Sequence, residues 1–322
     1  MKIVVFTNSS WGIPLLLELT KTNKLQGIII PSVVHHENEN IEAFAIENKI
    51  PIIRVRKEEL RSTLKDWLNE LSPDLAFCMT FPYLLPEEIL TIPSKGVVNF
   101  HFGQLPDYGG ADPLFWVLKE QQTVAHITAH LMAESFDKGY QVYQEQVPIY
   151  PGENWGLLGA RLSLVSASLA DKIITLLNLP ESNFKKIPEG QSKKKPDIKD
   201  LTINWANQTA DSIEALVNAS NPKYGGAITY FRGSMVRILE VSPADVSNAA
   251  LLSPGSIVHA DGQNGIFVLC SDYRFLRINI LRTPEAYITG HKLAALGVKS
   301  NEKFNSNYQI EKKEKAESSL IL

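Results

Sequence analysis

The sequence is poor in cysteine, has no strong excess of charge and contains no long apolar run. Its two cysteines among 322 residues, Cys78 and Cys270, lie far apart, and neither has a partner at the spacing of a metal site. We therefore expect two buried free thiols and no disulfide framework. A net charge of −3 does not indicate a DNA partner, because nucleic-acid binding usually requires a basic surface.

The absence of long apolar segments excludes further classes of protein. No stretch approaches the roughly 20 apolar residues that a transmembrane helix requires. The apolar run near the N-terminus, residues 3–6, is too short for a signal peptide. We expect a cytoplasmic protein with no membrane partner. Its length and its hydrophobic fraction of 44% are typical of a globular protein with two domains.

Residues 1–180 alternate between short apolar segments and amphipathic segments. Strands are expected near residues 2–7, 25–30, 52–55, 74–79, 97–101, 126–132 and 140–149. Helices are expected near residues 13–19, 40–48, 58–71 and 155–177. Strands that alternate with helices predict an α/β domain, in which helices flank a Rossmann-like, mostly parallel sheet.

The composition changes after Pro180. Residues 181–201 are rich in Pro, Gly, Ser and Lys, which indicates a linker that is either solvated or in contact with phosphate. Short strands separated by Gly and Asn turns follow, and they predict a small β-barrel over residues 202–305. Residues 306–322 are charged and then apolar without a period, so we expect a disordered tail.

A group of polar residues in the first domain is suited to catalysis. Asn99 and His101 end an apolar strand, and their spacing of two places both side chains on one face. A later strand runs into the turn that contains Asp137, which brings a carboxylate to the same sheet edge. An amide, an imidazole and a carboxylate together can support acyl transfer. For a lone Asn-x-His pair, the simpler interpretation is the capping of a strand end.

Further motifs favour the catalytic interpretation. Asn99-x-His101, then Leu105-Pro106, the glycines of Tyr108-Gly109-Gly110, and Asp137-x-Gly139 resemble the signature of the folate-dependent formyltransferases. This family includes the formyltransferases that act on methionyl-tRNA, glycinamide ribonucleotide and amino sugars. The resemblance implies that Asn99, His101 and Asp137 are catalytic, that 10-formyltetrahydrofolate is the co-substrate, and that no metal is needed. Asn204-Trp205 and residues 221–227 resemble the start of the OB-like barrel of the family.

The resemblance also implies a folate pocket. Residues 77–86 resemble the strand and Leu-Pro loop beside which the family binds folate, although ordinary core packing explains the same apolar residues equally well. Together with the turn before Asp137, this segment supplies the expected folate-binding residues, namely Met79, Phe81, Tyr83, Leu84, Leu85, Met132, Glu134 and Ser135.

Other residues are expected on the acceptor side. Residues 7–10 precede the first helix, whose N-terminus favours an anion, although a capping turn is the simpler interpretation. His130 lies in a Thr-x-His arrangement that some family members share, and a core histidine is the alternative. The expected acceptor-side residues are therefore Ser9, Ser10, Gly109, Gly110 and His130.

The acceptor is predicted from departures from the family pattern. Methionyl-tRNA formyltransferases carry a long basic insertion after the second strand, whereas residues 31–40 here are short and acidic. The family's Leu-Pro-x-x-Arg-Gly motif has lost its arginine, and Lys195-Pro196-Asp197 resembles the amino-sugar enzymes. We expect a small primary amine, for example on a nucleotide-linked amino sugar, with tRNA as the alternative.

Two further alternatives concern the reaction. A formyltetrahydrofolate hydrolase would share the Asn-His-Asp set, but it usually carries a regulatory domain before the catalytic fold, and we expect none here. A non-catalytic folate-binding protein would retain the fold, and the intact set argues against it. The oligomeric state is not predicted by the sequence.

Overall fold

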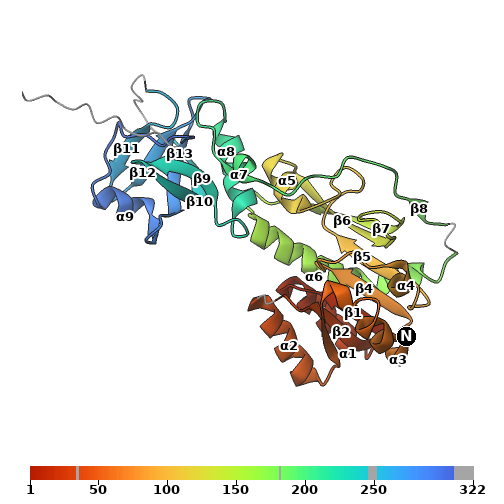
Figure 1. Ribbon diagram of the computed structural model, residues 1–322. Coiled ribbons are helices and arrows are strands. Elements are labelled where there is room, and N and C mark those ends of the chain that lie inside the picture. Colours follow the sequence, from red (N-terminus) through yellow and green to blue (C-terminus); the bar gives the residue numbers. More distant parts are fainter. Residues whose placement is uncertain (34–35, 181–182, 246–251, 308–322) are drawn as a thin grey trace, which may run out of the picture. The chain divides into compact units, whose positions relative to one another are not determined.

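The computed structural model describes residues 1–33, 36–180, 183–245 and 252–307 (Figure 1). The chain forms two compact units. The N-terminal unit consists of residues 1–117 and 122–195, and the C-terminal unit consists of residues 118–121 and the chain from Pro196 onward. Most of the expected tail, from residue 308, lies outside the described residues. None of the described helices is long and apolar enough to cross a membrane.

The N-terminal unit is built on one sheet of eight strands. Their order is β3 (Ile52–Val55), β2 (Leu25–Pro31), β1 (Ile3–Thr7), β4 (Leu75–Met79), β5 (Val97–His101), β6 (Val124–Leu131), β7 (Tyr140–Pro148) and β8 (Lys185–Lys186). The first five strands pair in parallel, and the pairings from β5 to β8 are antiparallel. The expected α/β fold is confirmed. β8 lies in the segment whose composition indicates a linker.

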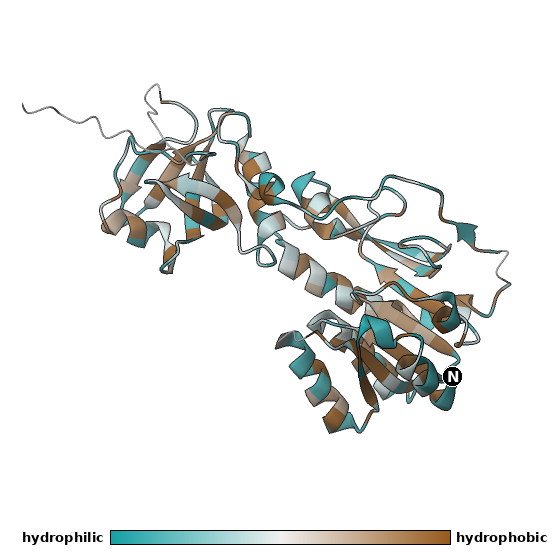
Figure 2. Cartoon of the chain, viewed as in Figure 1, coloured by the Kyte–Doolittle hydropathy of each residue, from teal (hydrophilic) through white to brown (hydrophobic). Residues whose placement is uncertain are grey.

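Helices cover both faces of this sheet. They are α1 (Ile13–Lys21), α2 (His36–Asn48), α3 (Thr63–Leu71), α4 (Glu87–Leu90), α5 (Pro113–Lys119) and α6 (Trp155–Leu176), with short 3₁₀ turns at η1 (Ser10–Gly12) and η2 (Lys57–Glu59). β1 and β4 are buried along their whole length, as expected for parallel strands with helices on both sides. Figure 2 shows these central strands in brown and the more polar faces of the helices in teal.

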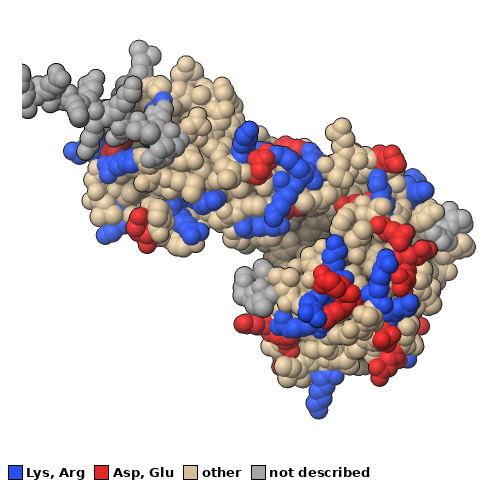
Figure 3. Space-filling view, in the orientation of Figure 1, with Lys and Arg blue, Asp and Glu red and all other residues tan. Residues whose placement is uncertain are grey.

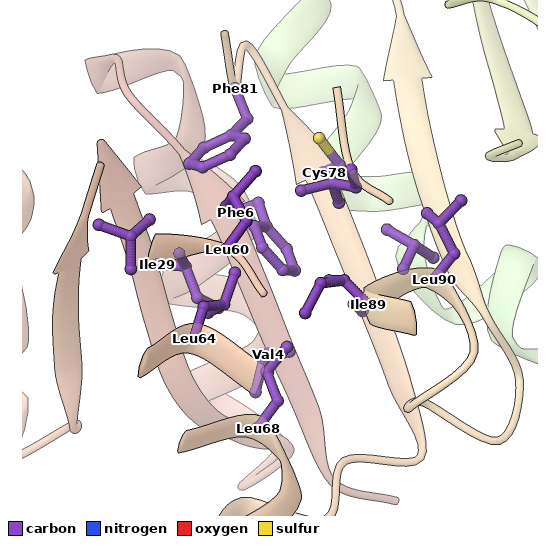
Figure 4. Packing of buried hydrophobic residues seen from close by; sticks show 14 residues of the cluster. Val4, Phe6, Ile29, Leu60, Leu64, Leu68, Cys78, Phe81, Ile89 and Leu90 are labelled. Atoms are coloured by element: carbon purple, nitrogen blue, oxygen red, sulfur yellow. The ribbon is translucent and has the colours of Figure 1, made fainter. Parts of the chain in front are cut away.

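The core of one face joins β1 to α3 and α4. Val4 and Phe6 of β1 pack against Leu64 and Leu68 of α3, with Ile89 of α4 beside them (Figure 4). Alternate residues of a strand point to opposite faces, so the remaining β1 side chains face the other layer of helices. There α6 is capped by Asn154, whose side chain accepts a hydrogen bond from the N–H of Leu157.

The C-terminal unit is an antiparallel β domain with three helices. It contains α7 (Ile198–Leu201), α8 (Ala210–Ser220), β9 (Ala227–Phe231), β10 (Ser234–Ala244), β11 (Ile257–Asp261), β12 (Gly265–Leu269), β13 (Phe275–Arg282), β14 (Tyr287–Thr289) and α9 (Gly290–Ala295). The strand order is β11-β12-β13-β10-β9, and β14 pairs with β13. Bridges from Lys303 to Ser256 and from Asn305 to Tyr230 join the two edges of the sheet, so it closes on itself.

Candidate active site

Asn99 and His101 lie on one face of β5, where the sheet changes from parallel to antiparallel pairing. On one side β5 pairs with β4, which places Cys78 opposite Asn99. On the other side it pairs with β6, which places His130 opposite Asn99 and Thr128 opposite His101. Residues directly opposite each other in a sheet point to the same face. The strand register therefore brings His130 beside Asn99.

Asp137 reaches His101 across this face of the sheet. The loop 132–139 leaves the sheet at the start of β5, where the N–H of Met132 donates to the carbonyl of Val97 at 2.8 Å. His101 lies four residues further along β5, about 13 Å away at the usual rise of a strand. Asp137 has a φ of 53°, and its Oδ1 lies 3.2 Å from His101 Nδ1. The loop thus folds back along β5 to deliver the carboxylate.

The ring of His101 is held from both sides. Its Nε2 lies 2.7 Å from the carbonyl oxygen of Tyr108, and its Nδ1 faces Asp137. A carbonyl and a carboxylate can only accept hydrogen bonds, so both contacts are satisfied together only when the ring carries two protons. The side chain is 7% exposed, which keeps water from competing for these contacts. The geometry favours a buried imidazolium.

Asp137 is itself held as a carboxylate. The N–H of Gly110 donates to its Oδ2 at 2.5 Å. Burial alone would raise the pKa of Asp137, but the hydrogen bond and positive charge of His101 and the N–H of Gly110 outweigh burial and lower it. The carboxylate therefore stays charged beside His101.

His130 orients the amide of Asn99. Its Nδ1 faces the carbonyl of Leu131 at 3.3 Å, and its Nε2 lies 3.2 Å from Asn99 Nδ2. Burial and the nearby charge of His101 lower the pKa of His130 to about 4, so the ring is neutral near pH 7. We assign the ring proton to Nδ1, because the carbonyl can only accept, and Nε2 then accepts from Asn99. The second amide hydrogen of Asn99 has no partner among the described residues.

The two segments expected to bind folate lie together. Phe81 and Leu85 belong to the hydrophobic core drawn in Figure 4, while Tyr83 and Met132 are partly buried against it. The N–H of Glu87 donates to Glu134 Oε1 at 3.4 Å, which links the loops. Leu85 is fully buried in that core and supports this surface from below, whereas Met79, also fully buried, follows Cys78 on β4 and so points to the opposite face of the sheet. Leu84 is half-buried, and exposed Ser135 borders a surface hollow lined by Lys138, Gly139 and residues 186–189.

The expected anion site before α1 is occupied by the chain itself. Ser9 and Thr80 share a hydrogen bond between their hydroxyl oxygens at 3.1 Å. The N–H of Ser10 donates to Glu37 Oε2 at 2.6 Å, so a carboxylate from α2 takes the position that a phosphate would need. β1 and β4 are adjacent, and Thr7 lies opposite Met79, which sets this loop two strands from Asn99.

Several contributions to the site were not predicted from the sequence. The carbonyl of Tyr108 and the N–H of Gly110 are main-chain groups, which a side-chain motif does not reveal. The sequence held one signal, the glycine at position 110. Its φ of 93° in the structure is a value that favours glycine. An aromatic group was also missed: the ring of Trp11 lies 4.5 Å from that of Trp155 and 5.7 Å from that of Phe102, which directly follows His101.

No cluster of three or more His, Cys, Asp or Glu side chains that could hold a metal is found among the described residues. The titratable groups at the site are instead paired with one another and with main-chain atoms. The arrangement is suited to stabilising a developing oxyanion with an amide donor and a buried cation, and to moving a proton.

Family models match both units. A model described as formyl transferase matches residues 1–169, and one described as the formyl transferase C-terminal domain matches residues 197–292. A methionyl-tRNA formyltransferase from Acetivibrio thermocellus is 29% identical over 266 residues, which cover 79% of this chain and 82% of that protein. The similarity therefore extends over most of the chain.

Solved structures share the fold at low sequence identity. WlaRD, a sugar 3N-formyl transferase studied in the presence of dTDP and 5-N-formyl-THF, has a TM-score of 0.62 and 17% identity, covering 86% of this chain and 96% of that one. HypX from Aquifex aeolicus has a TM-score of 0.63 and 16% identity over 93% of this chain. The chain spans 50% of the length of HypX.

Proposed function

This chain belongs to the folate-dependent formyltransferase family, and from that premise we propose that it moves a formyl group from 10-formyltetrahydrofolate to the primary amine of a small molecule, such as a nucleotide-linked amino sugar. The observation that carries the proposal is the arrangement of Asn99, His101 and Asp137 on the face of β5, with the amide donor and the paired imidazole side by side. We propose these three residues as the catalytic set.

The donor, when bound, supplies an electrophilic formyl carbon, and the residues of the chain do the rest. Asn99 directs its second amide hydrogen toward the formyl oxygen, where negative charge develops as the amine attacks. A preorganised donor of this kind is worth about 3 to 4 kcal/mol of barrier. His130 prevents the amide from rotating, because it accepts the first amide hydrogen. The donor is therefore preorganised before the substrates bind.

His101 and Asp137 provide the second part of the chemistry. The buried imidazolium stabilises the same developing charge, while its two N–H groups are held by the carbonyl of Tyr108 and by Asp137. Asp137 accepts a hydrogen bond from Nδ1 and so fixes the orientation of the ring. The imidazolium has no lone pair, so the proton that the attacking nitrogen loses passes to the Asp137 carboxylate or to water.

The folate would lie between the loops 80–85 and 132–137. Tyr83 and Met132 offer partly buried apolar surface over the core of β1 and β4, which suits a flat ring. Leu84 and Ser135 lie at the rim of this surface, since they are half-buried and exposed. Phe81 and Leu85 act from underneath, because they are buried in the core on which Tyr83 and Met132 pack.

The charge of the acceptor side favours a small amine over RNA. Glu37 already bonds the N–H of Ser10, so a phosphate there would meet a carboxylate. On the face shown in Figure 3, basic and acidic side chains are interspersed over the N-terminal unit. A track for an RNA backbone would instead need contiguous positive charge.

The second candidate acceptor is charged initiator tRNA. It is favoured by the similarity to proteins named methionyl-tRNA formyltransferase, which extends over most of the chain.

The test is an acceptor panel. Release of tetrahydrofolate from 10-formyltetrahydrofolate is followed with nucleotide-linked amino sugars, charged initiator tRNA and water as competing acceptors. We expect release that is coupled to formylation of a sugar amine. Release with tRNA alone would establish the second candidate, and release with water alone would identify a hydrolase. Folate binding without turnover on any acceptor would overturn the proposal.

A further inference from the structure

A short extended segment runs past both loops of the candidate site. We call residues 185–194 the strap; it begins at β8 and continues as the green segment of Figure 1. The whole strap belongs to the N-terminal unit and ends two residues before Pro196, where the C-terminal unit resumes. Its composition predicts a linker, yet its backbone is hydrogen-bonded to the rest of the N-terminal unit at both ends.

The first anchor of the strap holds the loop that carries Asp137. β8 pairs with the start of β7, directly after this loop. The N–H of Ile187 donates to the carbonyl of Gly139 at 2.9 Å, and Lys138 Nζ donates to the carbonyl of Pro188 at 3.3 Å. Ile187 is 5% exposed, so the anchor is also packed. Gly139 lies two residues after Asp137.

The second anchor holds the loop that follows His101. The N–H of Lys193 donates to the carbonyl of Gly109 at 2.7 Å, and the N–H of Ala111 donates to the carbonyl of Lys193 at 3.1 Å. These bonds flank Gly110, whose own N–H holds Asp137. A Cβ on Gly110 would lie 2.4 Å from the carbonyl oxygen of Lys193, so this approach requires glycine.

We propose that the strap is a positioning element of the active site, which fixes the spacing of the two loops around His101. Every main-chain group that grips His101 or Asp137 lies within two residues of an anchor: Tyr108 precedes Gly109, and Gly110 lies between the two bonds to Lys193. If the loops separate, the ring loses the carbonyl on one side or the carboxylate on the other. The rate of formyl transfer then falls even though the catalytic side chains are unchanged.

The anchors at the second loop are made by main-chain atoms, and this leads to a specific expectation. Removal of the Lys193 N–H should therefore cost more than truncation of the Lys193 side chain, although its ammonium lies 5.0 Å from the centre of the Tyr108 ring. A displacement of about 1 Å in a catalytic group can cost about a hundredfold in rate. The donor surface at Tyr83 and Met132 is built on the core and not on the strap, so binding of folate should change little.

The test compares proline with matched controls in the full chain. Lys193→Pro removes the N–H that bonds Gly109, and Lys193→Ala keeps it. Ile187→Pro does the same at the other anchor, and Ile187→Val is its control. We expect both proline variants to lose at least about tenfold in kcat, with KM for the folate within about threefold and a displaced pH profile of kcat. Both controls should stay within about twofold of the original chain.

The kinetic readout rests on the proposed function, so a readout without substrate accompanies it. The imidazole signals of His101, identified by their loss in His101→Asn, are followed by NMR across pH. They should move in Lys193→Pro and stay in place in Lys193→Ala, whichever acceptor the enzyme uses. Unmoved signals in a folded Lys193→Pro, or equal losses in both variants, would overturn the positioning role. A Lys193→Pro chain that fails to fold leaves Ile187→Pro to decide by the same criteria.

Discussion

In the proposed mechanism Asn99 presents one amide hydrogen in a fixed direction, and the buried neutral ring of His130 sets that direction. An amide can rotate by half a turn and exchange its donor for its acceptor. His130 offers an acceptor at Nε2, 3.2 Å from Asn99 Nδ2, and so removes the wrong orientation. The second amide hydrogen is then left for the formyl oxygen that we propose it binds.

Removal of the amide of Asn99 should weaken the transition state more than it weakens binding. We expect Asn99→Ala to lower kcat by about a hundredfold to a thousandfold while KM for the folate changes little, because the hydrogen bond strengthens as charge develops. Steady-state kinetics with the preferred acceptor measure both constants. A kcat within threefold of the original chain would exclude Asn99 as the oxyanion donor.

His130 should make the stability of the protein depend on pH in a defined window. Burial lowers the pKa of His130 from 6.5 to about 4. Between pH 6.5 and pH 4 the unfolded chain therefore binds a proton at this residue that the folded chain does not bind. The free energy of unfolding should therefore fall as the pH drops from 6.5 to 4, by on the order of 3 kcal/mol. Urea unfolding across this range measures the effect.

The matched variant for this window is His130→Gln, which can accept from Asn99 but does not titrate. It should lose the slope between pH 6.5 and 4, and an unchanged slope would contradict the assignment. Asp137 contributes in a different window: its pKa is lowered, so its stabilisation is lost only as the pH falls below its ordinary value of 3.8.

Glu37 should keep anions away from the loop before α1. Glu37→Ala frees the N–H of Ser10 and removes a charge, and Glu39→Ala removes a charge from the same helical turn without touching that N–H. We expect inorganic phosphate at millimolar concentration to shift the amide signal of Ser10 in Glu37→Ala alone. A shift of equal size in the original chain would show that Glu37 does not exclude phosphate.

At the scale of single residues, the sequence reveals side chains but not main-chain partners. The spacing of Asn99 and His101 gives their shared face directly, because strands have a period of two. The pairing of His130 with Asn99 depends on the register of β5 against β6, and no local pattern carries that register. The expectation of an anion near Ser10 took no account of Glu37, which is 27 residues away in the chain.

At the scale of elements, periodicity predicted most strands of both units. The fully buried strands β1 and β4 are apolar throughout, and such runs are distinctive. β8 was not predicted, because a lysine-rich pair has no strand signature and pairs only through its backbone. The packing partners of helices also stay hidden, as the contact between α6 and the turn η1 illustrates.

The packing of α6 on η1 should not tolerate a methyl group. A Cβ on Gly159 would lie 2.0 Å from the ring of Trp11, so Gly159→Ala should destabilise the fold by about 1 to 3 kcal/mol although alanine favours helices. Urea unfolding gives the value, and Ala160→Ser on the exposed side is the control. The cost should shrink in a Trp11→Leu background, and equal costs in both backgrounds would show that the ring is not the obstacle.

At the scale of the whole molecule, each unit contains one buried thiol that can report on its unfolding. Cys78 belongs to the N-terminal unit and Cys270 to the C-terminal unit. Burial raises the pKa of both thiols to about 12, aided at Cys270 by the carboxylate of Asp272. Neither should react with a thiol reagent at pH 8 in the native protein.

The thiols should become reactive only when their own unit opens. With Cys78→Ser and Cys270→Ser as single-thiol variants, labelling in increasing urea follows the two units separately. We expect each labelling curve to coincide with the loss of secondary structure in its own unit. Rapid labelling of either thiol without urea would contradict the burial seen here.

The strap also determines where a hybrid enzyme could be joined. For an exchange of C-terminal domains between relatives, the composition suggests a junction near residue 181. A junction there would join the N-terminal unit of this chain to the strap of a relative, which fits loops of another shape. The contacts that hold His101 would then be disturbed. A junction at Pro196 keeps the strap in the same chain as the loops that it holds. The modular boundary for engineering thus follows hydrogen bonds and not the change in amino-acid composition.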